Sequence, residues 1–311
     1  MSDLAFVFPG QGSQSVGMLT DLAQRHSLVG ETFAEAGQVL GRDLWALVCE
    51  GPSEALNATE LTQPLMLAGG VAVWRVWCQT TDTRPGLLAG HSLGEYSALV
   101  AAGALAFSDA VAVVAERARL MQAAVPEERG AMAAVLGLDE EVVEAICREV
   151  SEDQVVAPAN YNSPGQLVIA GDRAAVERAT GACLEAGAKR AVKLPVSVPS
   201  HCALMAPAAE KLAQTLQEIE LRMPSIPVLH NIDAAERGSP DAIREALVGQ
   251  LAAPVRWTAT IRKMIARKIA IVAECGPGRV LCGLGKRIDR STDWIALENP
   301  DQLAGLAARL T

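Results

Sequence analysis

The sequence lacks the features that mark membrane, secreted and metal-binding proteins. Half of its 311 residues are hydrophobic, but no run of eighteen uncharged apolar residues occurs, so we expect no transmembrane span. No basic segment precedes the first apolar run at residues 4–8, so we expect no signal peptide. The seven cysteines contain no Cys-x-x-Cys pair, which argues against a disulfide framework and a zinc site and favours a reducing cytoplasm.

Positive charge and histidine are also scarce. The net charge of −9 argues against nucleic-acid binding, and it means that an acidic partner would need a local basic patch. The chain has no internal repeats and no low-complexity segments. Its length favours one large domain with a smaller one. With only four histidines, few side chains can act as a general base near neutral pH.

The segment Gly90-His91-Ser92-Leu93-Gly94 has the strongest functional pattern. An apolar run at 87–89 precedes it, and a helix is expected to follow over 95–103. Strand, Gly-x-Ser-x-Gly and helix together form the context of a nucleophile elbow, in which a tight turn presents the serine hydroxyl. The N–H groups and the positive dipole end of the following helix would face developing negative charge. A glycine-rich turn without function is the alternative interpretation.

Two segments before the elbow also show clear patterns. The strand expected at 4–8 runs into the loop Pro9-Gly10-Gln11-Gly12-Ser13-Gln14. Glycine on both sides of Gln11 lets the backbone approach a ligand, although the loop also fits an ordinary strand-to-helix connection. Later, Thr62-Gln63-Pro64 precedes an apolar segment, and proline suits a first helical turn. This pattern predicts a buried helix over 65–78.

One arginine lies within the apolar side of a predicted helix. That helix is expected to begin at Ser108-Asp109 and to end near residue 124. At 100° per residue Arg117 falls between Val114 and Met121 on the apolar side, whereas Arg119 falls outside it. A buried guanidinium must be paired. Arg117 is therefore an internal salt-bridge residue, a side chain that reaches solvent, or a fixed cation for a substrate carboxylate.

A change of pattern after Pro126 indicates a small inserted domain over 127–197. The predicted order is strand, helix, two strands, helix and strand, which is ferredoxin-like. The strands are expected at 131–138, 155–160, 166–170 and 191–196, and the helices at 139–150 and 172–187. The large domain, 1–126 and 198–311, is then discontinuous.

The remaining chain favours an α/β fold. A helix is expected over 202–218, a strand and turn within 225–233, a helix ending at 250, and a strand at 269–273. Strands that alternate with helices predict a mostly parallel sheet flanked by helices, and the elbow makes this α/β-hydrolase-like. His201 and His230 both lie at element ends after Ser92, so each remains a candidate base, with a structural histidine as the alternative.

Five motifs occur in one order along the chain: Phe8-Pro9-Gly10-Gln11-Gly12-Ser13-Gln14, Gly90-His91-Ser92-Leu93-Gly94-Glu95-Tyr96, Ala159-Asn160-Tyr161-Asn162-Ser163-Pro164-Gly165-Gln166, Val198-Pro199-Ser200-His201 and Glu274-Cys275-Gly276-Pro277-Gly278. In this order they resemble the malonyl-CoA:acyl-carrier-protein transacylases of bacterial fatty acid synthesis. The likeness extends from the first strand to about residue 300.

The resemblance implies a two-step transfer of a malonyl group to acyl carrier protein. Ser92 would be the nucleophile, His201 its base and then its acid, and Arg117 the group that holds the malonyl carboxylate. The backbone N–H groups of Gln11 and Leu93 would form the oxyanion hole. The backbone carbonyl of Gln250 would orient the histidine.

We expect a cytoplasmic monomer, and the resemblance implies malonyl-CoA and acyl carrier protein as its partners. It implies no metal and no cofactor of its own, since the partner carries the phosphopantetheine. No nucleic acid or membrane partner is expected. Basic residues at Lys189, Arg190 and Lys193, or at Lys286, Arg287 and Arg290, could dock an acidic carrier, although ordinary surface charge explains either cluster as well.

Two other classes of function remain as alternatives. A serine esterase or thioesterase usually places an acidic residue between nucleophile and histidine in chain order. The acidic residues there fall mostly within 127–197, and a hydrolase leaves Arg117 without a role. A non-catalytic carrier-docking module does not explain the serine, histidine and arginine together.

Overall fold

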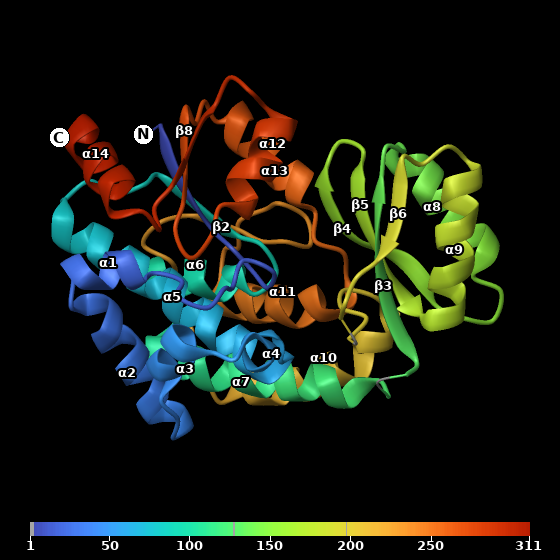
Figure 1. Ribbon diagram of the computed structural model, residues 1–311, viewed down its shortest axis with the longest axis horizontal. Coiled ribbons are helices and arrows are strands. Elements are labelled where there is room, and N and C mark those ends of the chain that lie inside the picture. The colour runs from blue at the N-terminus through green and yellow to red at the C-terminus, as the bar shows by residue number, and fades with distance from the viewer. Residues whose placement is uncertain (1–2, 127, 197) are drawn as a thin grey trace.

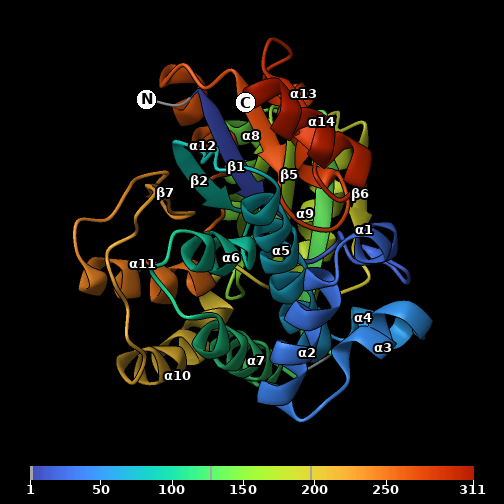
Figure 2. The same ribbon diagram turned by 90° about the vertical axis from the view of Figure 1, so that its left-hand side faces the viewer.

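A parallel sheet forms the centre of the larger part of the molecule (Figures 1 and 2). The computed structural model describes residues 3–126, 128–196 and 198–311. The strand order is β7-β2-β1-β8-β9, and every neighbouring pair is parallel. The strands are β1 (Leu4–Phe8), β2 (Leu87–Gly90), β7 (Val228–Leu229), β8 (Ile271–Glu274) and β9 (Asp293–Ala296). The predicted α/β class and parallel sheet are confirmed.

The central strand β1 is buried on both faces, which explains its uninterrupted apolar sequence. Leu4, Phe6 and Phe8 point into a large core shared with α5 (Thr59–Thr80) and α6 (Gly94–Ala101). Ala5 and Val7 point into a second core with α12 (Trp257–Ala266) and α13 (Val280–Ile288). Helices therefore cover both faces of the sheet.

The other helices of the larger part surround these layers (Figure 2). They are α1 (Thr20–Arg25), α2 (Leu28–Leu40), α3 (Leu44–Glu50), α4 (Ser53–Asn57), α7 (Phe107–Ala124), α10 (Ala206–Gln217), α11 (Pro240–Ala252) and α14 (Pro300–Leu310), with a 3₁₀ turn at Ala203–Met205. No helix in the described residues is long and apolar enough to cross a membrane.

A separate antiparallel sheet forms the smaller part, at the right of Figure 1. Its order is β4-β5-β3-β6, from β3 (Gly130–Leu136), β4 (Val156–Ser163), β5 (Gln166–Asp172) and β6 (Arg190–Lys193). Helices α8 (Glu140–Val150) and α9 (Arg173–Glu185) pack on one face. The other face carries Met132 and Val168 toward the larger part. The expected boundary residues 127 and 197 lie outside the described residues.

Several element boundaries differ from the predicted ones. The apolar helix begins at Thr59 rather than at residue 65, so Pro64 lies inside α5 and not in its first turn. Packing explains the extension, because Thr62 and Gln63 are buried against the core. The helix expected to start at Ser108-Asp109 begins at Phe107 instead, after Ala106, which has no side-chain cap.

Two predicted elements are divided or shortened in the structure. Residues 18–40, whose apolar spacing predicts helix, form the two helices α1 and α2, which are separated at His26 and Ser27. The segment expected at 225–233 contributes only two residues of strand at the sheet edge.

Candidate active site

Ser92 lies in a sharp turn between β2 and α6, with a backbone φ of 51°. This left-handed conformation is rare for residues other than glycine and stores strain. A Cβ atom on Gly90 would lie 1.9 Å from the Gly94 carbonyl carbon, and one on Gly94 would lie 2.0 Å from the Phe8 carbonyl oxygen. Only glycine fits at both positions. The turn therefore has the geometry that the Gly-x-Ser-x-Gly pattern predicts.

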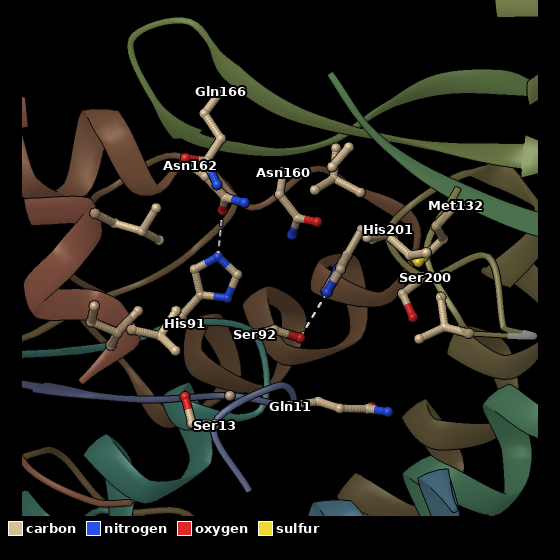
Figure 3. Close-up of a pocket in the computed structure, with 18 of the residues that line it drawn as sticks. Gln11, Ser13, His91, Ser92, Met132, Asn160, Asn162, Gln166, Ser200 and His201 are labelled. Carbon is tan, nitrogen blue, oxygen red and sulfur yellow. Dashed lines mark hydrogen bonds between the residues drawn. The ribbon is translucent and has the colours of Figure 1, made fainter. Parts of the chain in front are cut away.

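His201 lies directly against the serine hydroxyl (Figure 3). Its Nε2 atom is 2.7 Å from Ser92 Oγ, and its Nδ1 atom is 2.8 Å from the backbone oxygen of Gln250. The carbonyl can only accept, so Nδ1 carries the proton and Nε2 can accept from the serine. Burial, and then the charge of Arg117, lower the pKa of His201 to about 3. The ring is therefore neutral near pH 7, as a base requires.

Arg117 is 1 % exposed on α7, and its partners are neutral. Its Nη1 donates to Gln63 Oε1 at 2.6 Å and its Nη2 to Gln250 Oε1 at 3.0 Å. Nη2 also lies 3.4 Å from Ser92 Oγ. Among the ion pairs of the described residues none involves this arginine, and its Nε has no partner there. The internal salt bridge is therefore absent from the described chain, and the cation lies beside the serine.

Two backbone N–H groups are free near the serine. Within the described segments, the N–H groups of Gln11 and Leu93 donate to no protein acceptor. The loop of Gln11 approaches the elbow closely, since a Cβ on Gly10 would lie 2.5 Å from the His91 carbonyl oxygen. Free N–H groups at this position can stabilise an oxyanion.

A cavity of about 320 Å³ lies between the two sheets and reaches the serine (Figure 3). Gln11, Ser92 and His201 line it from the larger part, and β3, β4 and β5 line it from the smaller one. His91 turns away from the serine, and its Nε2 lies 2.8 Å from Asn162 Oδ1 on β4. The cavity reaches Ser92 and His201 along a partly apolar wall. No cluster of metal-ligating side chains occurs in the described residues.

His230, the other candidate base, lies away from the serine hydroxyl. Its Nδ1 is 2.7 Å from Glu95 Oε1, and both side chains are buried. Glu95 also accepts from Asn231 and Gln250, whose side chains form hydrogen bonds with the backbone of Ser92. The roles of Glu95 and Asn231 were not predicted from the sequence. The available signal was a carboxylate in an otherwise apolar helix.

A serine and a neutral histidine beside free N–H donors form an arrangement suited to acyl-group chemistry. Residues 5–295 match the family model described as an acyl transferase domain. The malonyl CoA-acyl carrier protein transacylase of Escherichia coli (strain K12) is 55% identical over 304 residues, which are 98% of each chain.

Solved structures of proteins with malonyl-transfer names are also similar to this chain. An acyl carrier protein S-malonyltransferase from Vibrio cholerae has a TM-score of 0.96 at 53% identity and covers 98% of this chain and 100% of its own. A malonyl-transacylase in complex with a type II polyketide acyl-carrier protein has a TM-score of 0.97 at 54% identity over 100% of both chains. The chain belongs to the malonyl CoA-acyl carrier protein transacylases of the acyl transferase family.

Proposed function

We propose that this chain transfers the malonyl group of malonyl-CoA to the phosphopantetheine thiol of acyl carrier protein, supplying fatty acid synthesis. The observation that carries this proposal is Arg117, a buried cation without a carboxylate partner in the described chain, 3.4 Å from Ser92 Oγ. A malonyl group brings a carboxylate to the same place as its reacting thioester. The names of the close relatives support the same substrates.

The proposed reaction has two half-reactions. Ser92 Oγ attacks the thioester carbonyl while His201 Nε2 takes its proton, and the oxyanion accepts from the N–H groups of Gln11 and Leu93. The carbon–sulfur bond breaks, His201 returns the proton to the leaving CoA thiol, and a malonyl-serine ester remains. The carrier thiol then attacks that ester by the same steps, which restores the serine. Ping-pong kinetics follow.

Each site residue has one role in this proposal. Arg117 binds the substrate carboxylate, and the Gln250 backbone oxygen fixes the proton of His201 on Nδ1. No cofactor or metal is needed, because serine, histidine and backbone groups supply the nucleophile, the base and the oxyanion donors.

The proposal extends to architecture and location. We infer an α/β-hydrolase-like large domain, 1–126 and 198–311, and a ferredoxin-like small domain, 127–197. The strand order β4-β5-β3-β6, with both helices on one face, supports the second assignment. The protein would act as a cytoplasmic monomer, and its seven free cysteines suit a reducing compartment.

Intact-mass and peptide mass spectrometry after mixing with malonyl-CoA tests this function. The proposal predicts a malonyl ester on Ser92 that disappears when holo-carrier protein is added, with malonyl-carrier as the product. Release of free malonate without transfer would indicate the hydrolase instead. Absence of an ester would indicate the docking module.

A further inference from the structure

Glu95 is fully buried three residues after the nucleophile, in the first turn of α6. A buried carboxylate is costly unless donors surround it. Oε2 accepts from the Asn231 backbone N–H at 2.9 Å, from Gln250 Nε2 at 3.0 Å, and from the Asn231 side chain. Oε1 accepts from His230 Nδ1 at 2.7 Å. No lysine or arginine in the described chain forms an ion pair with it.

The donors that Glu95 holds also hold the backbone of the nucleophile. Asn231 Oδ1 accepts the Ser92 N–H at 2.7 Å, and Asn231 Nδ2 donates to the Gly90 carbonyl at 2.7 Å. Gln250 Nε2 donates to the Ser92 carbonyl at 3.1 Å. A residue with a φ of 51° persists only where its surroundings over-determine it. Glu95 fixes the two side chains that do this.

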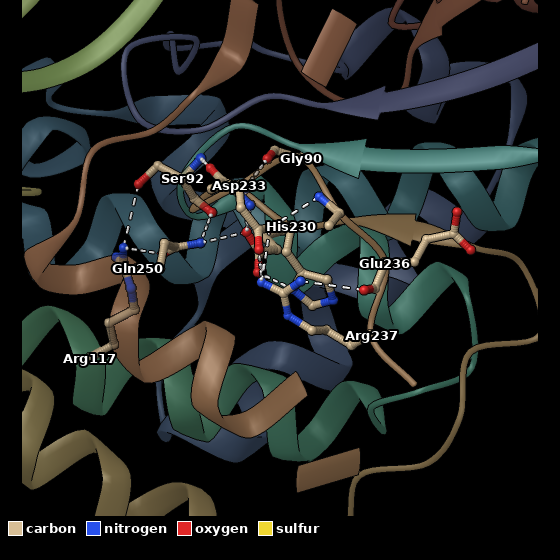
Figure 4. A network of polar contacts seen from close by, with 11 residues as sticks. Gly90, Ser92, Arg117, His230, Asp233, Glu236, Arg237 and Gln250 are labelled. Carbon is tan, nitrogen blue, oxygen red and sulfur yellow. Dashed lines mark hydrogen bonds and ion pairs between the residues drawn. The ribbon is translucent and has the colours of Figure 1, made fainter. Parts of the chain in front are cut away.

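Gln250 also connects Glu95 to the arginine of the site, and Figure 4 shows the Gln250 side chain beside Ser92 and Arg117. Its Oε1 accepts from Arg117 Nη2, while its Nε2 donates to Glu95. The carboxylate can only accept and the guanidinium can only donate, so the amide has one orientation. The negative charge of Glu95 thus lies one amide away from Arg117. The carboxylate therefore partly compensates the positive charge of Arg117 without accepting a hydrogen bond from the guanidinium itself.

We propose that Glu95 is a positioning residue of the transfer reaction, which fixes the Ser92 turn and tunes how strongly Arg117 attracts a carboxylate. The inference rests on the proposed function. It predicts opposite effects on two steps. Loss of the charge loosens the elbow and slows acylation. The same loss leaves Arg117 less compensated, so the malonyl carboxylate binds more tightly.

Glu95→Gln is the sharpest variant. Its amide oxygen can face Asn231 and Gln250, and its NH₂ can face His230 Nδ1, which accepts in its other tautomer. The variant thus removes the charge and can keep the hydrogen bonds. Single-turnover acylation gives a rate constant and a Kd for each thioester. We expect the rate constant to fall about tenfold and the Kd for malonyl-CoA to fall about threefold. The Kd for acetyl-CoA, which has no carboxylate, should stay unchanged.

Asp172→Asn is the matched control. Asp172 is 5 % exposed in the smaller sheet, where it accepts from Arg129 and the Val155 N–H. The control also removes a buried carboxylate charge, so it should lower the Tm and leave both kinetic constants unchanged.

If Glu95→Gln does not fold, Gln250→Met is the variant that tests the proposal. This substitution removes the side-chain amide that connects Glu95 to Arg117, and it keeps the backbone oxygen that accepts from His201. It must therefore lower both the acylation rate constant and the Kd for malonyl-CoA.

The outcomes separate the two proposals. A wild-type protein that forms no malonyl-Ser92 ester refutes the proposed function itself. A wild-type protein that forms the ester, with a Glu95→Gln rate constant or malonyl-CoA Kd equal to wild type, refutes only the role of Glu95. A Kd that rises equally for both thioesters also overturns that role, because this is the result expected from a merely structural residue.

Discussion

In the proposed reaction, Ser92 and His201 carry the covalent step at the scale of single residues. We expect Ser92→Ala to fold normally and to lose the acyl-enzyme. Removing a nucleophile of this kind from another serine enzyme costs on the order of 10⁶ in kcat. The check is transfer to holo-carrier protein beside a melting curve. Transfer above a few per cent of wild type would show that another group is the nucleophile.

The depressed pKa of His201 predicts an unusual pH profile. Its pKa is about 3, because burial and the charge of Arg117 oppose protonation. Acylation by malonyl-CoA should therefore keep its rate from pH 8 to about pH 5, with no one-proton loss near the ordinary histidine pKa of about 6.5. Initial rates at each pH, corrected for the folded fraction, test this. An acid limb centred near pH 6.5 would contradict it.

The same group makes stability depend on pH. In the unfolded chain this histidine binds its proton near pH 6.5, whereas in the folded protein its pKa is about 3. Between these values the unfolded state holds more protons, so folding stability rises with pH. The contribution of His201 is thus lost as the pH falls from about 6.5 toward 3. Urea midpoints of wild type and His201→Ala over this range should converge at low pH.

At the scale of elements, one loop approaches the elbow closely and carries Gln11, a proposed oxyanion donor. Gly10→Ala would place a Cβ 2.5 Å from the His91 carbonyl oxygen, so the loop that carries Gln11 must move. We expect kcat to fall by roughly 10²-fold, as for loss of an oxyanion donor. Gly30→Ala on α2 is the control, because a Cβ there meets nothing within 4 Å. Equal kcat in both variants would remove Gln11 from the site.

Local patterns made some of these elements predictable. The tight turn at Ser92 follows from its glycines, and the burial of Arg117 follows from helical spacing. Gln250 was inferred only through family resemblance, because its contacts join α11 to Arg117 on α7 and Glu95 on α6. No local pattern encodes such a meeting of distant segments. The choice of His201 over His230 likewise came from the resemblance, because local pattern alone left both histidines open. Strand β9 and helices α3, α4, α12 and α14 were not predicted.

At the scale of the whole molecule, docking of an acidic carrier needs local positive charge on a protein of net charge −9. The two basic clusters, 189–193 and 286–290, lie near residues that line the cavity, which are Leu194 just after β6 and Leu284 on α13. We expect double charge reversal at the docking cluster to raise the KM for carrier roughly three- to thirtyfold. The dependence of this KM on salt concentration should also weaken.

Lys286→Glu with Arg287→Glu and Arg190→Glu with Lys193→Glu test the two clusters separately. The KM for malonyl-CoA should change little in the variant that affects docking. If the KM values for malonyl-CoA and for carrier protein rise equally in both variants, neither cluster is the carrier site.

The central claim is that Arg117 is kept free of a carboxylate partner so that the substrate can supply one. Its most direct test is kcat/KM for malonyl-CoA and acetyl-CoA in wild type, Arg117→Ala and Arg119→Ala. Truncating one member of a buried charge pair costs about 2–5 kcal/mol, so Arg117→Ala should lose roughly 30- to 4,000-fold on malonyl-CoA. The kcat/KM of Arg117→Ala for acetyl-CoA should equal that of wild type. Arg119, exposed and paired with Glu116, should matter for neither. Parallel loss on both thioesters with a lowered Tm would contradict the claim and make Arg117 a structural residue.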